Sequence, residues 1–297
     1  MILRNIIIAF SILFVFTSCE DYLTETIEFE ELGFEPQIVI NAKVRDTLDF
    51  LQISVSPNIN LADGASSDFT FINGATVKVF IDGEEFEAIE DIDADPNVES
   101  YNYRLELGEN FDLSDKVYEL EVSHPDYTTV RSNTFVGQFP MINDISFEEE
   151  ARTTTFFGYP LVQDATTFTI VDEDEGPNFY KIDMNTDGFF SFVETDDADA
   201  INLGGFEGTV LLSDENFVNG VKQITVFSEN NPWQEAIDRS LIVSNISESE
   251  YLFLQSFELY QQSTDFGFFS EPVTLYTNIE NGLGVFSAIQ SESFPVE

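Results

Sequence analysis

The sequence has very few of the side chains that metal and nucleophilic sites use most often. Among 297 residues there are one cysteine, one histidine and one tryptophan. With Cys19 alone, no intrachain disulfide and no Cys–His zinc site can form. His124 precedes Pro125 in a predicted turn, and no Ser–His–Asp motif accompanies it, so we interpret it as structural. Trp233 is the one side chain available as a sugar-stacking indole.

Positive charge is also scarce, since 11 Lys and Arg stand against 56 Asp and Glu, giving a net charge of −45. This excludes nucleic acid as a partner and disfavours close contact with anionic lipid. Two interpretations stay open. In the first, the charge keeps the protein soluble in a salty medium, where acidic side chains more than about 10 Å apart are screened from one another. In the second, it forms a docking face for a cationic partner. General disorder is excluded because 43% of the residues are hydrophobic, with 31 Phe.

A single apolar run stands out, and it is too short to cross a bilayer. Ile6–Phe16 is shorter than the roughly 20 apolar residues that a membrane-spanning helix needs. Residues 1–18 have the parts of an export signal peptide, and the small Thr17 and Ser18 suit a cleavage site. We predict cleavage before Cys19 and lipidation of its thiol, because a lone cysteine at the predicted cut has no disulfide partner to explain it. Two or three acyl chains would then anchor the protein stably. The alternative is an ordinary secretory signal followed by an unpaired cysteine.

The stretch Phe14–Cys19 resembles the lipobox of bacterial lipoproteins, with Phe16 where that motif prefers Leu. Residues 19–36 are predicted to be an acidic tether, which charge repulsion would extend. The acidic Glu20 and Asp21 resemble the signal that sends Bacteroidota lipoproteins to the cell surface. These resemblances imply a lipid-anchored protein of the outer membrane that faces the cell exterior.

From Gln37 the apolar residues follow a period of two, which is typical of half-buried strands. The alternation is clear in Ile38–Val44, Leu51–Val55 and Ala75–Ile81, and Asp82-Gly83 predicts a hairpin turn. About seven short strands within residues 37–139 predict an antiparallel β-sandwich of immunoglobulin or transthyretin type.

Gly137–Pro140 is the predicted boundary, and residues 140–297 are predicted to form a second β-rich domain. One helix is expected there, near 247–262. Ser247 is its expected N-cap and Glu250 its N3 residue, the pattern of a capping box. The fold class is therefore mainly β, with a sandwich followed by a β-rich domain that contains one helix in the C-terminal half of the chain.

The closing stretch is the most distinctive after the leader. Phe269–Val273 (FSEPV) and Thr277–Phe286 (TNIENGLGVF) resemble the "F-x-E-P … N-I-x-G-G-L-G-x-F" ending of the Bacteroidota lipoproteins called domain of unknown function 4249. Asn281 replaces the first Gly of that ending, and Asn also tolerates positive φ. The resemblance covers essentially the whole mature chain. It implies an outer-membrane lipoprotein, often encoded beside large TonB-dependent β-barrel proteins, with no catalytic residues. We expect Gly282 and Gly284 to allow a tight turn and a bulge.

One acidic loop places oxygen atoms at alternate positions, as the first nine positions of an EF-hand do. It contains Asp91, Asp93, Asp95, Asn97 and Glu99. Pro96 stands where an EF-hand needs Gly, and Asn102 stands where it needs Glu, so the loop is not an EF-hand. A solvated hairpin loop is the preferred interpretation, and weak calcium binding is the alternative.

Two aromatic clusters, Phe189–Phe192 and Phe266–Phe269, are interpreted as core residues or as an exposed patch that docks to another protein. No motif indicates catalysis or a cofactor, and two neighbouring carboxylates mean little among 56. We therefore predict a non-catalytic accessory subunit of a large outer-membrane β-barrel complex, either a TonB-dependent transporter or an envelope-assembly machinery. A module that captures a glycan, a peptide or Ca²⁺ for a transporter is the alternative.

Overall fold

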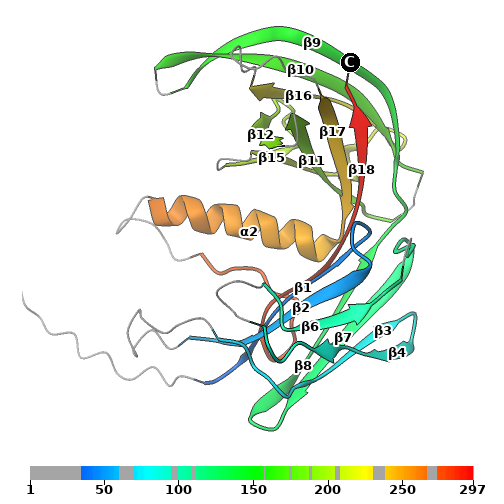
Figure 1. Cartoon of the computed structure of the whole chain (residues 1–297). Helices are drawn as coiled ribbons and strands as arrows, with labels where there is room; N and C mark the ends of the chain where they lie inside the picture. Colours follow the sequence, from blue (N-terminus) through cyan, green and yellow to red (C-terminus); the bar gives the residue numbers. More distant parts are fainter. Residues whose placement is uncertain are drawn as a thin grey trace, which may run out of the picture. The chain divides into compact units, whose positions relative to one another are not determined.

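The computed structural model describes most of the chain beyond the predicted tether. The described residues are 35–59, 70–94, 100–108, 111–156, 158–173, 176–186, 189–204, 208–229, 238–265 and 273–296. The leader 1–18, Cys19 and nearly all of the tether 19–36 lie outside them. Residues Pro36–Glu297 form one compact unit. The described part is mainly β with one α-helix in its C-terminal half, which confirms the predicted fold class (Figure 1).

The largest of the three described sheets has ten strands. Its order is β14-β15-β11-β17-β18-β1-β2-β6-β5, and β12 pairs with β11. The strands are β1 (Ile38–Arg45), β2 (Phe50–Pro57), β5 (Ile89–Glu90), β6 (Tyr103–Glu106), β11 (Phe179–Thr186), β12 (Phe189–Ser191), β14 (Ile201–Leu203), β15 (Thr209–Ser213), β17 (Arg239–Ile246) and β18 (Leu283–Pro295).

Two four-stranded sheets accompany the large one. The first has the order β4-β3-β7-β8 and the second β13-β16-β10-β9. Their strands are β3 (Thr76–Ile81), β4 (Glu84–Glu87), β7 (Lys116–His124), β8 (Tyr127–Val136), β9 (Met141–Phe156), β10 (Tyr159–Val171), β13 (Val193–Glu194) and β16 (Val221–Glu229). A 3₁₀-helix, η2, spans Asp214–Asn216, and the α-helix, α2, spans Glu248–Asp265.

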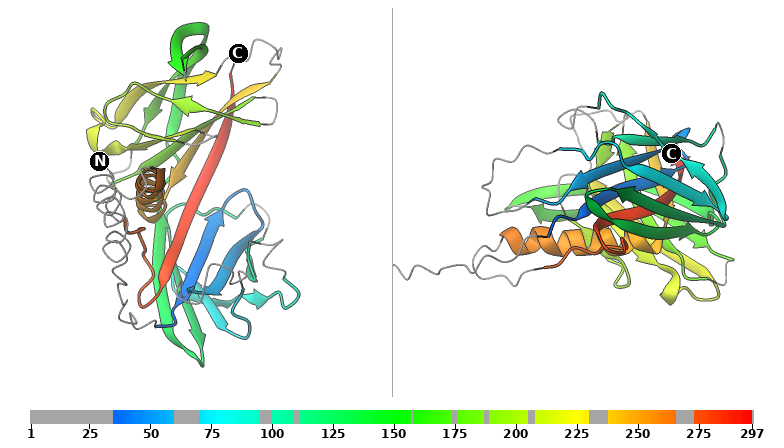
Figure 2. Two further views of the ribbon diagram at one scale, coloured as in Figure 1. Left: turned by 90° about the vertical axis from the view of Figure 1, so that its left-hand side faces the viewer. Right: turned by 90° about the horizontal axis from the view of Figure 1, so that it is seen from below.

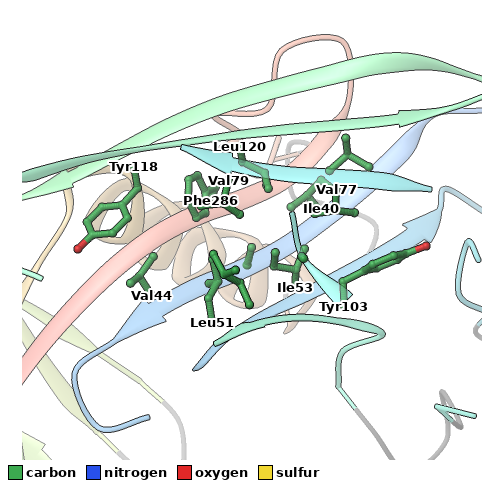
Figure 3. Close-up of a cluster of buried hydrophobic side chains, with 14 of the residues drawn as sticks. Ile40, Val44, Leu51, Ile53, Val77, Val79, Tyr103, Tyr118, Leu120 and Phe286 are labelled. Carbon is green, nitrogen blue, oxygen red and sulfur yellow. The ribbon is translucent and has the colours of Figure 1, made fainter. Parts of the chain in front are cut away.

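The first hydrophobic core lies between β1, β2 and β6 on one side and the sheet of β3, β7 and β8 on the other. Side chains of β1 alternate, so that Ile40 and Val44 are buried while Asn41 and Arg45 are exposed. Figure 3 shows side chains of both sheets pointing into the space between them. Two sheets packed in this way form a β-sandwich, as the period-two pattern predicted.

The second core lies between β10 and β16 on one side and β11, β15 and β17 on the other. Phe168 of β10, Ile182 of β11 and Val243 of β17 are fully buried there. Tyr180 stacks on Phe217 with ring centroids 5.8 Å apart. The large sheet therefore contributes one layer to each of the two cores.

Strand β18 joins these two parts of the large sheet. It pairs in parallel with β1 from Val39↔Leu283 to Arg45↔Ile289. Its C-terminal half then pairs antiparallel with β17, up to Ser240↔Pro295. The left view of Figure 2 shows β18, in red, running beside β1, in blue. The domain bounds 37–139 and 140–297 stay predictions. Strand β18 is hydrogen-bonded both to β1, within residues 37–139, and to β17, within residues 140–297.

Candidate docking surface on helix α2

Helix α2 begins directly after β17, at a capping residue. The Glu250 N–H donates to Ser247 Oγ at 3.4 Å, which confirms Ser247 as the N-cap. The other half of the predicted capping box is wrong, because the Ser247 N–H donates to the Ala288 carbonyl oxygen of β18 at 2.9 Å. The Ala288 N–H donates back to Ser247 Oγ at 3.1 Å. The cap therefore ties the start of α2 to β18.

The carboxylate of Glu250 has a different partner from the one that the capping box predicted. Lys43 Nζ of β1 lies 2.6 Å from Glu250 Oε1, and the Glu250 side chain is only 2% exposed. Glu250 Oε2 and Ser287 Oγ are buried and have no hydrogen-bond partner among the described residues. Ser287 is the β18 residue that pairs with Lys43. A buried charge depends strongly on its partner, so this ion pair fixes the first turn of α2 against the sheet.

The segment that returns from α2 to β18 is held by one asparagine of the motif Thr277–Phe286. Asn278 Oδ1 accepts from the Phe286 N–H at 3.0 Å, and Asn278 Nδ2 donates to the Phe286 carbonyl oxygen at 2.8 Å. The same Nδ2 donates to the Asn133 carbonyl oxygen at 3.1 Å. Asn278 therefore connects the return segment to β18 and β8, a role that the sequence motif did not reveal.

The glycines of this motif permit a close approach of two strands. The expected tight turn is present, because Asn281 has φ +61° and the Gly282 N–H donates to the Ile279 carbonyl oxygen at 3.4 Å. The expected bulge is wrong, since the register of β1 with β18 is continuous. Gly284 has φ +99°, and a Cβ there would overlap the carbonyl oxygen of Ile40. Only glycine lets the two backbones lie this close.

The outer part of α2 leaves apolar side chains in solvent. From Tyr251 to Ser263 none of its side chains is buried. Phe257 is 38% exposed, Leu259 52% and Tyr260 42%. Phe253, Phe257 and Tyr260 lie on one face and stack in succession. A helix normally buries its apolar stripe, so an exposed aromatic face of this kind is a candidate docking surface. We call Phe253, Phe257 and Tyr260 the α2 surface; Leu259 lies on another side of the helix, because residues two apart do not share a helix face.

A polar cleft of about 390 Å³ lies at the other end of α2, around its first turn. It is lined by side chains and backbone from β8, the loop before β11, the helix start and the return segment. Asp115 and Glu248 bring negative charge to it, and Asn133 and Asn178 bring amides. Burial and the nearby Glu248 raise the pKa of Tyr276, another lining residue. This lining suits a cation or a hydrogen-bonding ligand better than an anion.

The described part of the acidic loop forms an ordinary turn. Asp91 Oδ1 accepts from the Asp93 N–H at 3.3 Å in an exposed turn. Asp95, Asn97 and Glu99, the rest of this acidic loop, lie outside the described residues.

The one histidine also belongs to a turn. His124 Nδ1 accepts from the Asp126 N–H at 3.2 Å, and its ring packs on Tyr127 with centroids 5.4 Å apart. His124 therefore supports the turn between β7 and β8, as the sequence indicated.

Two residues of the first aromatic cluster are exposed, whereas its last member, Phe192, is half-buried. Phe189 is 74% exposed and Phe190 is 51% exposed, both on β12. The second cluster, Phe266–Phe269, and Trp233 lie outside the described residues. The aromatic residues that gather on one face are instead those of the α2 surface, and their helical spacing was the signal in the sequence.

Asp172 and Asp214 are two carboxylates that lie close enough to interact. Tyr180 Oη donates to the buried Asp172 Oδ2 at 2.6 Å, and Asn178 Nδ2 donates to the same oxygen at 3.0 Å. Burial, together with the neighbouring Asp172, raises the pKa of Asp214. No group of three or more His, Cys, Asp or Glu within the described ranges is arranged to hold a metal ion.

Comparison with known proteins identifies the chain by its family. The family model with the description "Domain of unknown function (DUF4249)" matches residues 24–294. The chain belongs to the DUF4249 family. No curated protein matches this DUF4249 chain.

Among solved structures, the chain is similar to a Corynebacterium diphtheriae protein described as membrane anchored, at 11% identity and a TM-score of 0.21. The match covers 73% of the DUF4249 chain and 56% of that protein. A likeness this weak supports no conclusion about function. In the described part of the DUF4249 chain, no helix is both long and apolar enough to cross a membrane.

Proposed function

We propose that this DUF4249 protein is a non-catalytic accessory subunit of a large outer-membrane β-barrel complex, either a TonB-dependent transporter or an envelope-assembly machinery. The observation that carries the proposal is the α2 surface, on which Phe257 and Tyr260 are exposed together. Burying such side chains at an interface is worth about 25 cal/mol per Å² of apolar area. A rigid helix that presents aromatic residues is a common way to engage a protein partner.

The rigid base of α2 supports a docking role. The Ser247 cap, the Lys43–Glu250 ion pair and the Asn278 hydrogen bonds all fix the helix start or its return segment to the sheets. A preorganised surface loses little conformational entropy when it binds. Asp172 and His124 are of residue types that often serve catalysis in other proteins. Here both accept hydrogen bonds that stabilise the fold.

The anchor is part of the same proposal. Lipid on Cys19 would hold the protein at the outer membrane, facing the cell exterior, beside its partner. Labelling with a clickable palmitate analogue tests this, with Cys19→Ser as the matched control. We expect label on the natural chain and none on the variant. An unlabelled natural chain found free in the medium would contradict the anchor.

The docking role is tested by extraction in a mild detergent, followed by mass spectrometry of the proteins that co-purify. We expect an outer-membrane β-barrel protein to be recovered with the natural chain. Tyr260→Ser should reduce its recovery by about tenfold. Phe189→Ser, at an aromatic residue of β12 that is also exposed, should not. Recovery of the natural chain as a lone monomer would refute the proposal.

The polar cleft favours a second candidate, a module that captures a ligand for a transporter. Asp115 and Glu248 could bind a cation, and Asn133 and Asn178 could bind hydroxyl groups of a glycan. Calorimetry with calcium and then with glycan pools tests this function. Heat of binding that Glu248→Gln abolishes would support it, and no heat with either ligand would exclude it.

A further inference from the structure

The return segment pairs with only part of the edge of β8. The Arg131 N–H donates to the Glu280 carbonyl oxygen at 3.4 Å, and the Glu280 N–H donates to the Arg131 carbonyl oxygen at 2.7 Å. Two residues further along β8, the Asn133 carbonyl oxygen accepts from Asn278 Nδ2. The register of β7 with β8 is continuous here, so every second residue of β8 directs its N–H and C=O away from β7. The next such residue is Phe135.

The backbone of Phe135 is left open at this edge. If the return segment continued its antiparallel pairing with β8, Tyr276 would lie opposite Phe135. Instead the Tyr276 N–H donates to Ser256 Oγ of α2 at 2.9 Å, so at this residue the return segment is bonded to α2 and not to β8. Among the described residues, neither the N–H nor the carbonyl oxygen of Phe135 has a hydrogen-bond partner. An unpaired strand edge is a template for another strand.

The polar cleft at the start of α2 lies along this open edge. Its lining includes five consecutive residues, Asn133–Gly137, from the end of β8 and the position after it. At about 3.3 Å per residue these span on the order of 13 Å, which is the length of an extended peptide of four or five residues. Asp115 and Glu248 also line the cleft, and no Lys, Arg or His is among its described lining residues. The cleft therefore combines a strand edge with negative charge.

We infer that the cleft binds an extended peptide segment of a partner protein, which adds a strand to the edge of β8 and places a Lys or Arg side chain near Asp115 and Glu248. The N–H and carbonyl oxygen of Phe135 would bond to the peptide backbone, as in other cases of strand addition. The inference rests on the second candidate function, capture of a ligand, and names that ligand as a peptide. A glycan also carries hydroxyl groups, but another extended backbone repeats the donor and acceptor spacing of a strand edge.

Acidic segments are disfavoured in this cleft. A second copy of the chain carries the same net charge of −45, and the predicted tether 19–36 contains no Lys or Arg. Repulsion from Asp115 and Glu248 would weaken the binding of either. The peptide must therefore come from a partner with basic residues.

A random library of eight-residue peptides, displayed on phage and selected on the full chain in detergent, tests this chemistry without assuming a sequence. We expect the enriched peptides to contain Lys or Arg and to lack Asp and Glu. The most enriched peptide is then synthesised with and without N-methyl groups on its backbone nitrogens. N-methylation removes the donors that strand pairing needs, so it should weaken binding by at least about tenfold. A library without enriched sequences, or equal binding of the N-methylated peptide, would overturn the inference.

Variants of Phe135 locate the binding. Phe135→Pro removes its N–H, which points away from β7, and proline is tolerated at such edge positions. This variant should bind the enriched peptide at least about tenfold more weakly, whereas Phe135→Ala, which keeps the N–H, should lose less than about threefold. Equal binding to the natural chain and to a folded Phe135→Pro variant would refute strand addition.

A second variant keeps the test decisive if Phe135→Pro fails to fold. Glu248→Gln removes one of the two charges of the cleft and should weaken binding of the enriched peptide by about tenfold. Glu119→Gln is the matched control, because Glu119 is exposed on β7 and does not line the cleft. Equal losses in these two variants would show attraction to net charge alone and would overturn the inference.

Calorimetry separates the inference from the function on which it rests. If a glycan pool gives heat that Glu248→Gln abolishes and no peptide binds, ligand capture stands and the peptide inference fails. If neither a peptide nor a glycan nor calcium binds, both fail. Recovery of a β-barrel protein with the natural chain tests the docking role of the α2 surface and does not depend on the cleft.

Discussion

The strongest test of the fold is the substitution Gly284→Ala, because Gly284 lies where β1 and β18 approach most closely. An added Cβ would overlap the Ile40 carbonyl oxygen and would lie 2.8 Å from its carbon and 3.0 Å from the Ile40 nitrogen. All three are backbone atoms, so no side-chain rotation relieves the overlap. The strands must separate, which disrupts parallel hydrogen bonds in the centre of the sheet.

The expected cost has two parts. Placing an L-residue at φ +99° costs about 1–2 kcal/mol. Separating the strands leaves two or three backbone hydrogen bonds impaired, at about 1–1.5 kcal/mol each. We therefore expect Gly284→Ala to lower the free energy of unfolding by about 4–6 kcal/mol, which is a large part of the 5–15 kcal/mol typical of native proteins.

Two other glycines provide matched controls. Gly83 has φ +84° with no atom within 4 Å of an added Cβ, so Gly83→Ala should cost only the backbone strain, about 1–2 kcal/mol. Gly282→Ala would meet the Ile38 carbonyl oxygen at 2.7 Å and should fall between the two. Urea unfolding followed by circular dichroism measures all three variants. A loss for Gly284→Ala within 1 kcal/mol of that for Gly83→Ala would refute the reasoning.

Three further predictions concern polar groups. Lys43→Met should lower the free energy of unfolding by about 3–5 kcal/mol in urea melts, because it leaves the buried Glu250 without a cation, and adding Glu250→Leu should restore most of the loss. Because the pKa of Asp214 is raised in the folded state, its contribution to stability is present at low pH and is lost as the pH rises through that pKa. Asp214→Asn should therefore raise the melting temperature at about pH 7, and the gain should vanish near pH 3, below the usual carboxyl pKa of about 3.9. An equal gain at both pH values would contradict this cause. Asn278→Ala should cost about 2–3 kcal/mol and speed hydrogen exchange at the Phe286 amide; unchanged exchange would show that the return segment is held by other contacts.

Local patterns in the sequence were sufficient to predict several elements. The alternation in Ile38–Val44 predicted β1, and Asp82-Gly83 predicted the turn after β3, where both residues have positive φ. The Ser247 cap was predicted because capping depends on residues within one helical turn. Each of these features is decided by neighbours in the chain.

Long-range pairings could not be predicted in the same way. The parallel pairing of β1 with β18 and the Lys43–Glu250 ion pair join distant parts of the chain, and no local pattern encodes either. The long strands β9 and β10 are irregular in their pairing. Asp144 and Glu150 have positive φ, and the register of β9 with β10 shifts near both residues. These irregularities interrupt the period of two that marks a strand.

For the candidate site, the sequence predicted the helix but not its surroundings. The spacing of Phe253, Phe257 and Tyr260 is visible in the sequence, and helices of globular proteins usually bury such a stripe. Whether a stripe is covered depends on what packs on it, and only the structure shows that Phe257 and Tyr260 stay exposed. Phe189 and Phe190 illustrate the same limit, because their sequence is also consistent with a place in a core, whereas both are exposed.

The place of β18 in the sheet has a consequence for how the molecule acquires its structure. A ribosome makes β1 among the first strands and β18 as the last, yet the two are direct neighbours. The growing chain must therefore keep one edge of β1 open during nearly all of its synthesis. Such a topology folds slowly, and unpaired edges invite aggregation. A chain that stops before Leu283 lacks β18 and therefore leaves both the edge of β1 and the edge of β17 unpaired. Even this short C-terminal truncation should yield insoluble protein.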